Sequence, residues 1–346
     1  MKRMLMLALA LMFGTAHAQI TYSIKHLGPD PDPPNVYLYY IMDLNDRGDV
    51  IGGAYATEGI WSWMLTNEGQ FTRLPSLPNP PYPASEAFAI NNRRQVVGSG
   101  YEEGFQGYRP FLWQRGDIRD IGSFPEAGTV YANDINTRGL VIGDVYLDQN
   151  RTPFVQFGSN YHTLETLGGN GYTSAYRVNE LGVICGYSEV PTGGSHAVIW
   201  SRDGHIHDLG VLPGGSSSSA SGINDFGDVA VTTRFGQFGE TSLPAVWRHG
   251  QLNPLPLLHG GTDVRAGAAG INDLGQIIGS EQSNGQNTPL LWQRGQVYDV
   301  NDLIRANDPL RASVQIRDVI FINNRGQIVA TGTDNRNYLL TPSGHL

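Results

Sequence analysis

Tyrosines and carboxylates stand at positions of this sequence where they could bind a ligand. Nine of them are candidate ligand-binding residues: Tyr40, Glu86, Tyr101, Tyr108, Tyr131, Asp144, Tyr172, Tyr187 and Asp318. A tyrosine ring offers a flat apolar surface with a polar hydroxyl at its edge, which suits sugars and peptides alike. The alternative interpretation is that these side chains only pack loops against one another.

Three of the carboxylates also allow a catalytic hypothesis. Hydrolysis of a glycosidic bond needs two carboxyl groups roughly 5 to 10 Å apart. Glu86, Asp144 and Asp318 would meet this need if the fold brought them together at the mouth of a channel. The chain has no zinc-protease, phosphate-loop, dinucleotide-binding or calcium-loop motif. The sequence therefore assigns no catalytic residue and no cofactor, although a site built from separate repeats would leave no short motif.

His205 and His207 raise the question of a metal site. Alternate residues of a strand point to the same side, so both imidazoles could face one ion. No third ligand follows nearby, and the predicted strand is an outer one. We interpret the pair as part of a solvated strand face and predict no metal site.

An internal repeat supplies the scaffold for these residues. Similar turns, such as "INDFGDV" and "INDLGQI", recur around seven asparagines: Asn45, Asn91, Asn136, Asn179, Asn224, Asn272 and Asn323. Three residues after each asparagine stands a glycine, except in the second copy, which has Arg94. Glycine adopts positive φ without steric cost, and asparagine bonds nearby backbone amides. We therefore interpret the seven asparagines as structural parts of tight turns.

The spacing of the asparagines predicts the fold. The gaps are 46, 45, 43, 45, 48 and 51 residues, and each repeat before the last contains four short runs. Four strands in a unit of this length are typical of a propeller blade. The sequence therefore predicts an all-β protein, a seven-bladed β-propeller of four-stranded blades. The rival fold is a linear β-solenoid.

The two ends of the chain favour a closed ring. The last repeat ends after its third run, at residues 337–340, whereas residues 20–28 alternate like the fourth runs elsewhere. We expect this N-terminal strand to complete the last blade and to close the propeller. A solenoid would not need such a pairing.

The first residues have the features of an export signal. A basic start, an apolar run and the small residues Ala16 and Ala18 indicate a signal peptide at residues 1–18. We expect residues 19–346 to form a single propeller domain that is secreted or periplasmic, with no membrane insertion after signal removal. The net charge of −9, without any basic run, disfavours nucleic acid as a partner. The single cysteine, Cys185, excludes an intramolecular disulfide.

The repeat resembles the HAF-repeat family of extracellular bacterial proteins. The closest segments are "INDLGQIIGS" and "SHAVIWSRDGHIHDLG", and the similarity covers nearly all of residues 20–340. The His-Ala-Phe triplet that names the family is degraded, since His196, Ala197 and Val198 come nearest to it. The resemblance implies a repeat fold and export. It implies no activity and no catalytic residues.

Loop lengths distinguish the two faces of the predicted ring. The face with the Asn-x-x-Gly turns is nearly uniform, whereas the opposite face carries loops that vary in length and chemistry. Binding is usually placed on such variable loops. The leading hypothesis is a non-enzymatic scaffold that binds a glycan or an extracellular protein or peptide there. The alternatives are a hydrolase or lyase acting on polysaccharide, and a structural component of the envelope or matrix.

Overall fold

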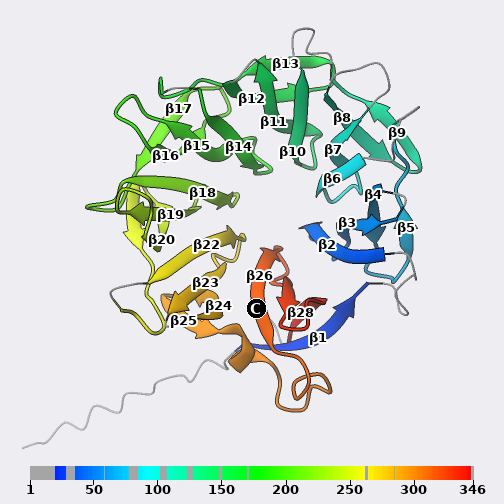
Figure 1. Ribbon diagram of the computed structural model, residues 1–346, viewed down its shortest axis with the longest axis vertical. Helices are drawn as coiled ribbons and strands as arrows, with labels where there is room; N and C mark the ends of the chain where they lie inside the picture. The colour runs from blue at the N-terminus through cyan, green and yellow to red at the C-terminus, as the bar shows by residue number, and fades with distance from the viewer. Residues whose placement is uncertain are drawn as a thin grey trace, which may run out of the picture.

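The protein is an all-β propeller with four-stranded blades. The computed structural model describes residues 20–28, 36–57, 59–77, 85–101, 107–122, 128–147, 150–169, 171–261, 264–283 and 285–343. In these ranges the chain forms 28 strands and one short 3-10 helix, arranged as a ring (Figure 1). The predicted signal peptide lies outside the described residues. Within them, no helix is long and apolar enough to cross a membrane.

The first four repeats each form one antiparallel sheet, in which the first strand is innermost and the fourth is outermost (Figure 1). Repeat 1 contains β2 (Val36–Leu44), β3 (Val50–Ala56), β4 (Gly59–Leu65) and β5 (Phe71–Arg73). Repeat 2 contains β6 (Ser85–Ile90), β7 (Val96–Tyr101), β8 (Tyr108–Gln114) and β9 (Asp117–Asp120). Repeat 3 contains β10 (Thr129–Ile135), β11 (Leu140–Leu147), β12 (Asn150–Phe157) and β13 (Asn160–Thr163). Repeat 4 contains β14 (Thr173–Val178), β15 (Ile184–Glu189), β16 (Ser195–Trp200) and β17 (Ile206–Gly210).

The remaining repeats complete the ring. Repeat 5 contains β18 (Ser217–Ile223), β19 (Val229–Phe235), β20 (Thr241–Arg248) and β21 (Gln251–Pro254). Repeat 6 contains β22 (Arg265–Ile271), β23 (Ile277–Ser283), β24 (Gln286–Gln293) and β25 (Gln296–Asp299), followed by the 3-10 helix η1 (Val300–Leu303). Repeat 7 contains β26 (Ile316–Ile322), β27 (Ile328–Gly332) and β28 (Asn337–Ser343).

The predicted number of seven separate four-stranded blades is wrong. The described strands form five separate four-stranded sheets, and the eight strands of repeats 5 and 6 form one continuous sheet. A parallel pairing of Ser242 in β20 with Arg265 in β22 joins them. The Ser242 amide donates to the Val264 carbonyl at 3.2 Å, and the Arg265 Nε donates to the Glu240 carbonyl at 2.9 Å. The repeat spacing gives no information on whether neighbouring sheet edges meet, so the sequence could not predict this union.

The N-terminal strand lies beside the last strands of the chain. β1 (Thr21–Leu27) pairs antiparallel with β28, from Thr21 opposite Ser343 to Leu27 opposite Asn337 (Figure 1). Its inward residues Tyr22 and Ile24 are buried in the core around repeat 7. β1 therefore forms the fourth strand of the repeat 7 sheet. Its hydrogen bonds to β28 and the burial of its apolar side chains together close the ring.

The hydrophobic cores lie between neighbouring sheets. Ile51 and Met64 of repeat 1 pack against Ala87, Val96 and Phe111 of repeat 2. Each sheet has a neighbour on both faces, so its central strands are apolar on both sides. This packing explains why the third strands read as continuous apolar runs, as the four consecutive buried residues in β8 do.

The repeated asparagines bind the turns to one another. Each one accepts hydrogen bonds from the amides two and four residues later, as Asn272 does from Leu274 and Gln276 at 3.1 and 3.0 Å. Its amide nitrogen then donates to the backbone carbonyl of the asparagine in the next repeat. The seven bonds measure 2.9 to 3.2 Å and end with Asn323 donating to the Asn45 carbonyl. The turns thus form a closed ring of hydrogen bonds.

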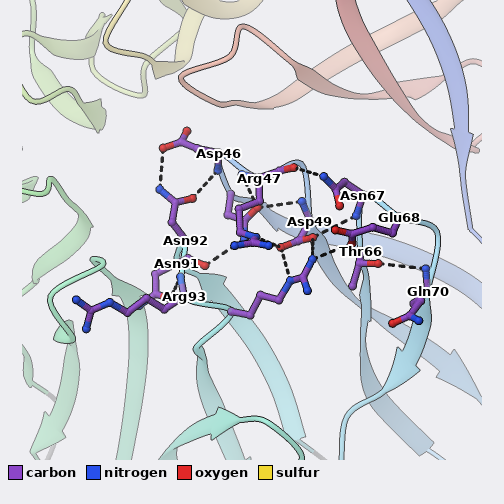
Figure 2. Close-up of polar contacts among 12 residues, drawn as sticks. Asp46, Arg47, Asp49, Thr66, Asn67, Glu68, Gln70, Asn91, Asn92 and Arg93 are labelled. Atoms are coloured by element: carbon purple, nitrogen blue, oxygen red, sulfur yellow. Dashed lines mark hydrogen bonds and ion pairs between the residues drawn. The ribbon is translucent and has the colours of Figure 1, made fainter.

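A second contact joins the turns of repeats 1 and 2. The Asp46 amide donates to Asn92 Oδ1 at 2.8 Å, and Asn92 Nδ2 donates to Asp46 Oδ2 at 2.8 Å (Figure 2). The buried Asp49 carboxylate accepts from the Asn67 amide at 3.1 Å in the same network (Figure 2).

The network around Asp49 explains why the second repeat can lack its turn glycine. Arg94 has a φ of 58°, a left-handed conformation that costs a non-glycine residue about 1 to 2 kcal/mol. Its Nε and Nη2 bind both oxygens of Asp49 at 2.9 and 3.0 Å. Burial alone would raise the pKa of Asp49, but the bonds from Arg94 and Asn45 lower it. This paired contact with a buried carboxylate offsets the backbone strain.

A β-bulge in the innermost strands shapes the centre of the ring. The pairing register shifts at Phe88, Tyr176 and Ser221, where one residue of the inner strand has no partner. Opposite the bulge lies a residue such as Gly98, where an added Cβ would come within 1.9 Å of the Glu86 carbonyl oxygen. Because a bulge turns two successive side chains toward one side, it places an additional side chain of each inner strand at the channel.

Removal of the N-terminal strand should open the ring. We expect deletion of residues 19–28 to lower the melting temperature strongly, since seven residue pairs with β28 and the buried Tyr22 and Ile24 are lost. An Ile24→Asp variant should reproduce the loss, whereas Lys25→Asp, at an exposed position of the same strand, should not. Thermal unfolding followed by circular dichroism measures the effect. An unchanged melting temperature on deletion would contradict this role of β1.

Loss of one ring asparagine should destabilise the fold more than loss of a surface asparagine. Asn272→Ala removes two accepted bonds and two donated bonds at a buried position, so we expect unfolding to become easier by about 3 kcal/mol or more. Asn253→Ala, on exposed β21, is the matched control. Chemical denaturation measures both. Equal effects of the two substitutions would show that the ring contributes little.

Candidate functional site

A cavity of about 330 Å³ lies in the centre of the ring. Its lining residues come from the inner strands of six repeats and are Met42, Phe88, Asn133, Tyr176, Arg177, Ser221 and Phe321. The bulged residues Phe88, Tyr176 and Ser221 are among them. The irregularity of the inner strands therefore builds the cavity wall.

Arg177 is the charged group of this cavity. Its guanidinium lies over the Phe321 ring at 5.4 Å and makes no hydrogen bond or ion pair with any described residue. Asp43 and Asp134 are close enough to interact with it electrostatically. Asp43 accepts from the Ile90 amide at 2.9 Å and Asp134 from the Val178 amide at 2.8 Å. The guanidinium thus keeps its donors available in the channel, between two carboxylates that the backbone holds in place.

Burial governs the pKa values of the two carboxylates. It raises the pKa of Asp134 to about 6, an effect that Arg177 opposes and the nearby Asp43 reinforces. Burial also raises the pKa of Asp43. Since one guanidinium faces two carboxylates, one of the two carboxyl groups takes up a proton more readily than an isolated aspartate.

Eight tyrosines of repeats 1 to 4 form ring contacts on the variable-loop side, and one of them, Tyr176, lines the cavity. We call them the tyrosine rim: Tyr40, Tyr55, Tyr101, Tyr108, Tyr131, Tyr146, Tyr176 and Tyr187. Tyr108 and Tyr131 stack at 5.6 Å with an angle of 28° between their planes, and Tyr146 meets Tyr131 edge-on at 5.7 Å. The rings are partly exposed, so the rim presents aromatic faces and hydroxyl groups to solvent.

The rim and the cavity form one site, which we call the funnel. Phe88 of the cavity contacts Tyr131 at 6.0 Å, and Tyr176 contacts Tyr187 at 5.5 Å. The Asn133 side chain donates to Asp144 Oδ2 at 2.6 Å. Burial raises the pKa of Tyr176 to about 12 and also raises that of Tyr131 and Tyr187. These hydroxyls therefore stay neutral at physiological pH and can both donate and accept hydrogen bonds.

An ion pair supports the middle of the funnel. Asp144 is fully buried, and Arg151 binds its Oδ2 through Nε at 3.0 Å and Nη2 at 2.6 Å. Ser174 and the Ala175 amide also donate to this carboxylate. The Arg151 guanidinium lies 5.8 Å from the Tyr146 ring. Asp144 therefore holds Arg151 in place beside the rim.

Most of the candidate residues from the sequence lie together in the structure. Tyr40, Tyr101, Tyr108, Tyr131 and Tyr187 belong to the rim. Glu86 joins them by accepting a hydrogen bond from the Tyr40 hydroxyl at 3.2 Å. Candidates at fixed distances from the turn asparagines lie on the first two strands of each repeat. Residues of these strands pair across the turn, as Tyr131 does with Asp144, so their side chains lie close together.

Three candidates have other positions. Asp144 lies beneath the rim, where its oxygens are occupied by protein groups. Tyr172 is half exposed before β14 and makes no ring contact with any described residue. Asp318, in repeat 7, accepts from Arg317 Nε and from the side-chain Nδ2 of Asn287, each at 2.7 Å. Asp144 and Asp318 are therefore both engaged by arginines and do not form a free carboxylate pair.

Sequence reasoning missed Phe88, Asn133, Arg151, Tyr176 and Arg177. Regular alternation along the inner strand would place only one of two successive residues at the channel, and the bulge brings both there. A bulge signal was present, because a glycine opposite the inner strand recurs as Gly98 and Gly186. Within the described ranges, no three His, Cys, Asp or Glu residues cluster so as to hold a metal ion.

Comparison with known proteins identifies the fold. No protein-family model matches the chain, and no curated protein matches it. The structure is similar to virginiamycin B lyase from Staphylococcus aureus, with a TM-score of 0.53 and 11% identity over 92% of this chain and 99% of that one. It is also similar to the β-propeller domain of the Trilobed protease from Pyrococcus furiosus, with a TM-score of 0.58 and 12% identity over 88% and 96% of the chains. At these identities the likeness shows the propeller fold alone.

The raised pKa of Asp134 predicts a pH dependence of stability. The folded state binds the Asp134 proton more tightly than the unfolded chain, so this contribution is complete below about pH 4 and is lost as the pH rises through about 6. An Asp134→Asn variant lacks the titration. Its melting temperature relative to the natural protein should therefore rise between pH 4.5 and pH 7.5.

The control for this experiment is Asp117→Asn on exposed β9, which removes one surface charge. Calorimetry at several pH values measures both variants. A difference that stays constant, or that falls with rising pH for Asp134→Asn, would contradict the role of burial at Asp134.

Proposed function

We propose that this protein is a non-enzymatic binding scaffold whose funnel takes a glycan. One observation carries the proposal: partly exposed tyrosines of four neighbouring repeats form ring contacts, and these contacts reach the central cavity through Phe88 and Tyr176. Sugar rings stack on such faces, and their hydroxyl groups bond to polar groups at the ring edges. Arg151, which binds Asp144 through Nε and Nη2, adds the donors of its Nη1 at the same place.

The carboxylates give less support to a glycan-cleaving reaction. Such a reaction needs a general acid and a second carboxylate at defined separation. Asp144 has Arg151, Asn133 and Ser174 bound to it, and Asp318 is bound to Arg317 and Asn287. Binding without cleavage is therefore the better use of the funnel.

We also propose an extracytoplasmic location and membership in the HAF-repeat family. The support comes from the signal-like residues 1–18 and from the repeat motifs. In repeat 4 the His196 Nδ1 lies 2.9 Å from both oxygens of Asp208, so the first residue of the name-giving triplet meets the first residue of the Asp-Leu-Gly element. Arg109 and Asp120 form the corresponding pair in repeat 2.

Glycan binding can be tested with the mature chain on a glycan array, followed by calorimetric titration of the best ligand. We expect Tyr131→Ala and Tyr187→Ala each to weaken binding by about tenfold or more, because each removes a ring of the rim. Tyr161→Ala, on exposed β13, is the matched control and should leave binding unchanged. Binding that survives both rim substitutions would show that the funnel is not the site.

The same experiment separates the other hypotheses. Binding on a peptide array and not on the glycan array would assign the funnel to a protein partner. Release of shortened sugar chains would reveal catalysis. If neither array gives binding, the rim serves packing alone and a structural role for the protein follows.

A further inference from the structure

The turn face of the ring, opposite the funnel, has a crevice of about 310 Å³ between repeats 3 and 4. Its floor and walls are mainly apolar and include Leu140, Val155, Leu164, Leu181 and Ile184. The guanidinium groups of Arg138 and Arg202 stand at its edge, exposed, and form no hydrogen bond or ion pair with any described residue. The crevice thus combines an apolar interior with unpaired positive charge.

The crevice results from a departure from the repeat pattern. In five repeats the residue four positions after the asparagine is Asp or Gln, and its side chain accepts a bond from that asparagine. Repeats 3 and 4 have Leu140 and Val183 there. Leu140 lines the crevice, so repeat 3 has apolar surface there in place of a bond that stabilises the turn.

The third strand of repeat 3 departs in the same direction. Trp113, Trp200, Trp247 and Trp292 occupy one equivalent position of the third strands, since each pairs with the residue five positions after the asparagine. In repeat 3 this position holds Gln156, which is buried, and the next residue, Phe157, is 60% exposed at the crevice. A polar residue inside and an aromatic residue outside reverse the usual order of burial.

Apolar surface continues from the crevice along the neighbouring turns. Leu181, Phe226 and Leu274 occupy the tips of three successive turns and are 49%, 78% and 47% exposed. These turns touch one another, since the Glu180 amide donates to Asp225 Oδ1 and the Asp225 amide donates to Asp273 Oδ1, each at 2.8 Å. The equivalent tips in the other repeats are arginines. We call these three exposed tips the apolar band; apolar side chains gathered on one side of a face mark an interaction surface.

We propose that this band and crevice bind an extended segment of a partner protein, which inserts an aromatic side chain flanked by carboxylates. The aromatic side chain fits the apolar crevice, and the flanking carboxylates meet Arg138 and Arg202. A segment, not a small molecule, accounts for the apolar tips at Phe226 and Leu274, which lie beyond the crevice. This site is independent of the funnel, because it lies on the opposite face of the ring.

The test uses three fluorescein-labelled peptides with the cores Glu-Phe-Asp, Glu-Ala-Asp and Lys-Phe-Lys in the same glycine flanks. Fluorescence anisotropy with the mature protein measures binding. We expect the Glu-Phe-Asp peptide to bind at least about tenfold more tightly than the other two. Arg138→Glu and Leu181→Asp should each abolish that preference. Both residues are exposed, so both variants should keep the melting temperature of the natural protein.

Two controls make the result specific. Arg93→Glu reverses the charge of an equivalent turn tip away from the crevice and should leave peptide binding unchanged. Tyr131→Ala should also leave it unchanged, which separates this site from the funnel. Equal binding of all three peptides, no binding of any, or retention in Arg138→Glu and Leu181→Asp would overturn the proposal. Saturation by N-acetylphenylalanine with the same affinity as the peptide would overturn the assignment to a protein segment.

Discussion

The structure depends on one interaction, the hydrogen bond from each ring asparagine to the carbonyl of the next. Each side chain stabilises its own turn and at the same time fixes the distance to the following repeat. Because Asn323 donates to the Asn45 carbonyl, the seven bonds form a closed ring. The position of each repeat relative to the next is therefore tightly constrained. The pairing of β1 with β28 reinforces this closure at the outer edge. The sheets can therefore vary in their loops without changing the centre.

Much of this fold could be predicted from the sequence because its determinants are local. The turn asparagines, the glycines at positive φ and the alternation of residues 20–28 all act over a few residues. The union of repeats 5 and 6 depends instead on the pairing of Ser242 with Arg265, which lie in different repeats. Likewise, Arg94 interrupts the pattern, and its partner Asp49 belongs to the preceding repeat. These two contacts join residues of different repeats that do not recur in the other copies, so the repeated motif does not predict them.

The candidate site shows the same division. Tyr40, Tyr131 and Tyr187 could be found by counting from the asparagines, because residues in register across an inner hairpin share one side of the sheet. Phe88, Tyr176 and Arg177 could not, because the bulge changes the direction of the side chains within one strand. The role of Asp144 depends on Arg151, which lies on the adjacent strand β12, and on Ser174, which lies in the next repeat. Its burial is thus a property of the assembled ring.

The funnel is not symmetric about the axis of the ring. The position that carries Tyr40 and Tyr131 in repeats 1 and 3 is filled by Ser174, Ser219 and Gly267 in repeats 4, 5 and 6. The part of the wall formed by repeats 1 to 4, which carries the rim tyrosines, is therefore high and aromatic, and the part at repeats 5 and 6 is low. Any molecule that rests against the high part is held off-centre, and a long chain can continue outward across the low part.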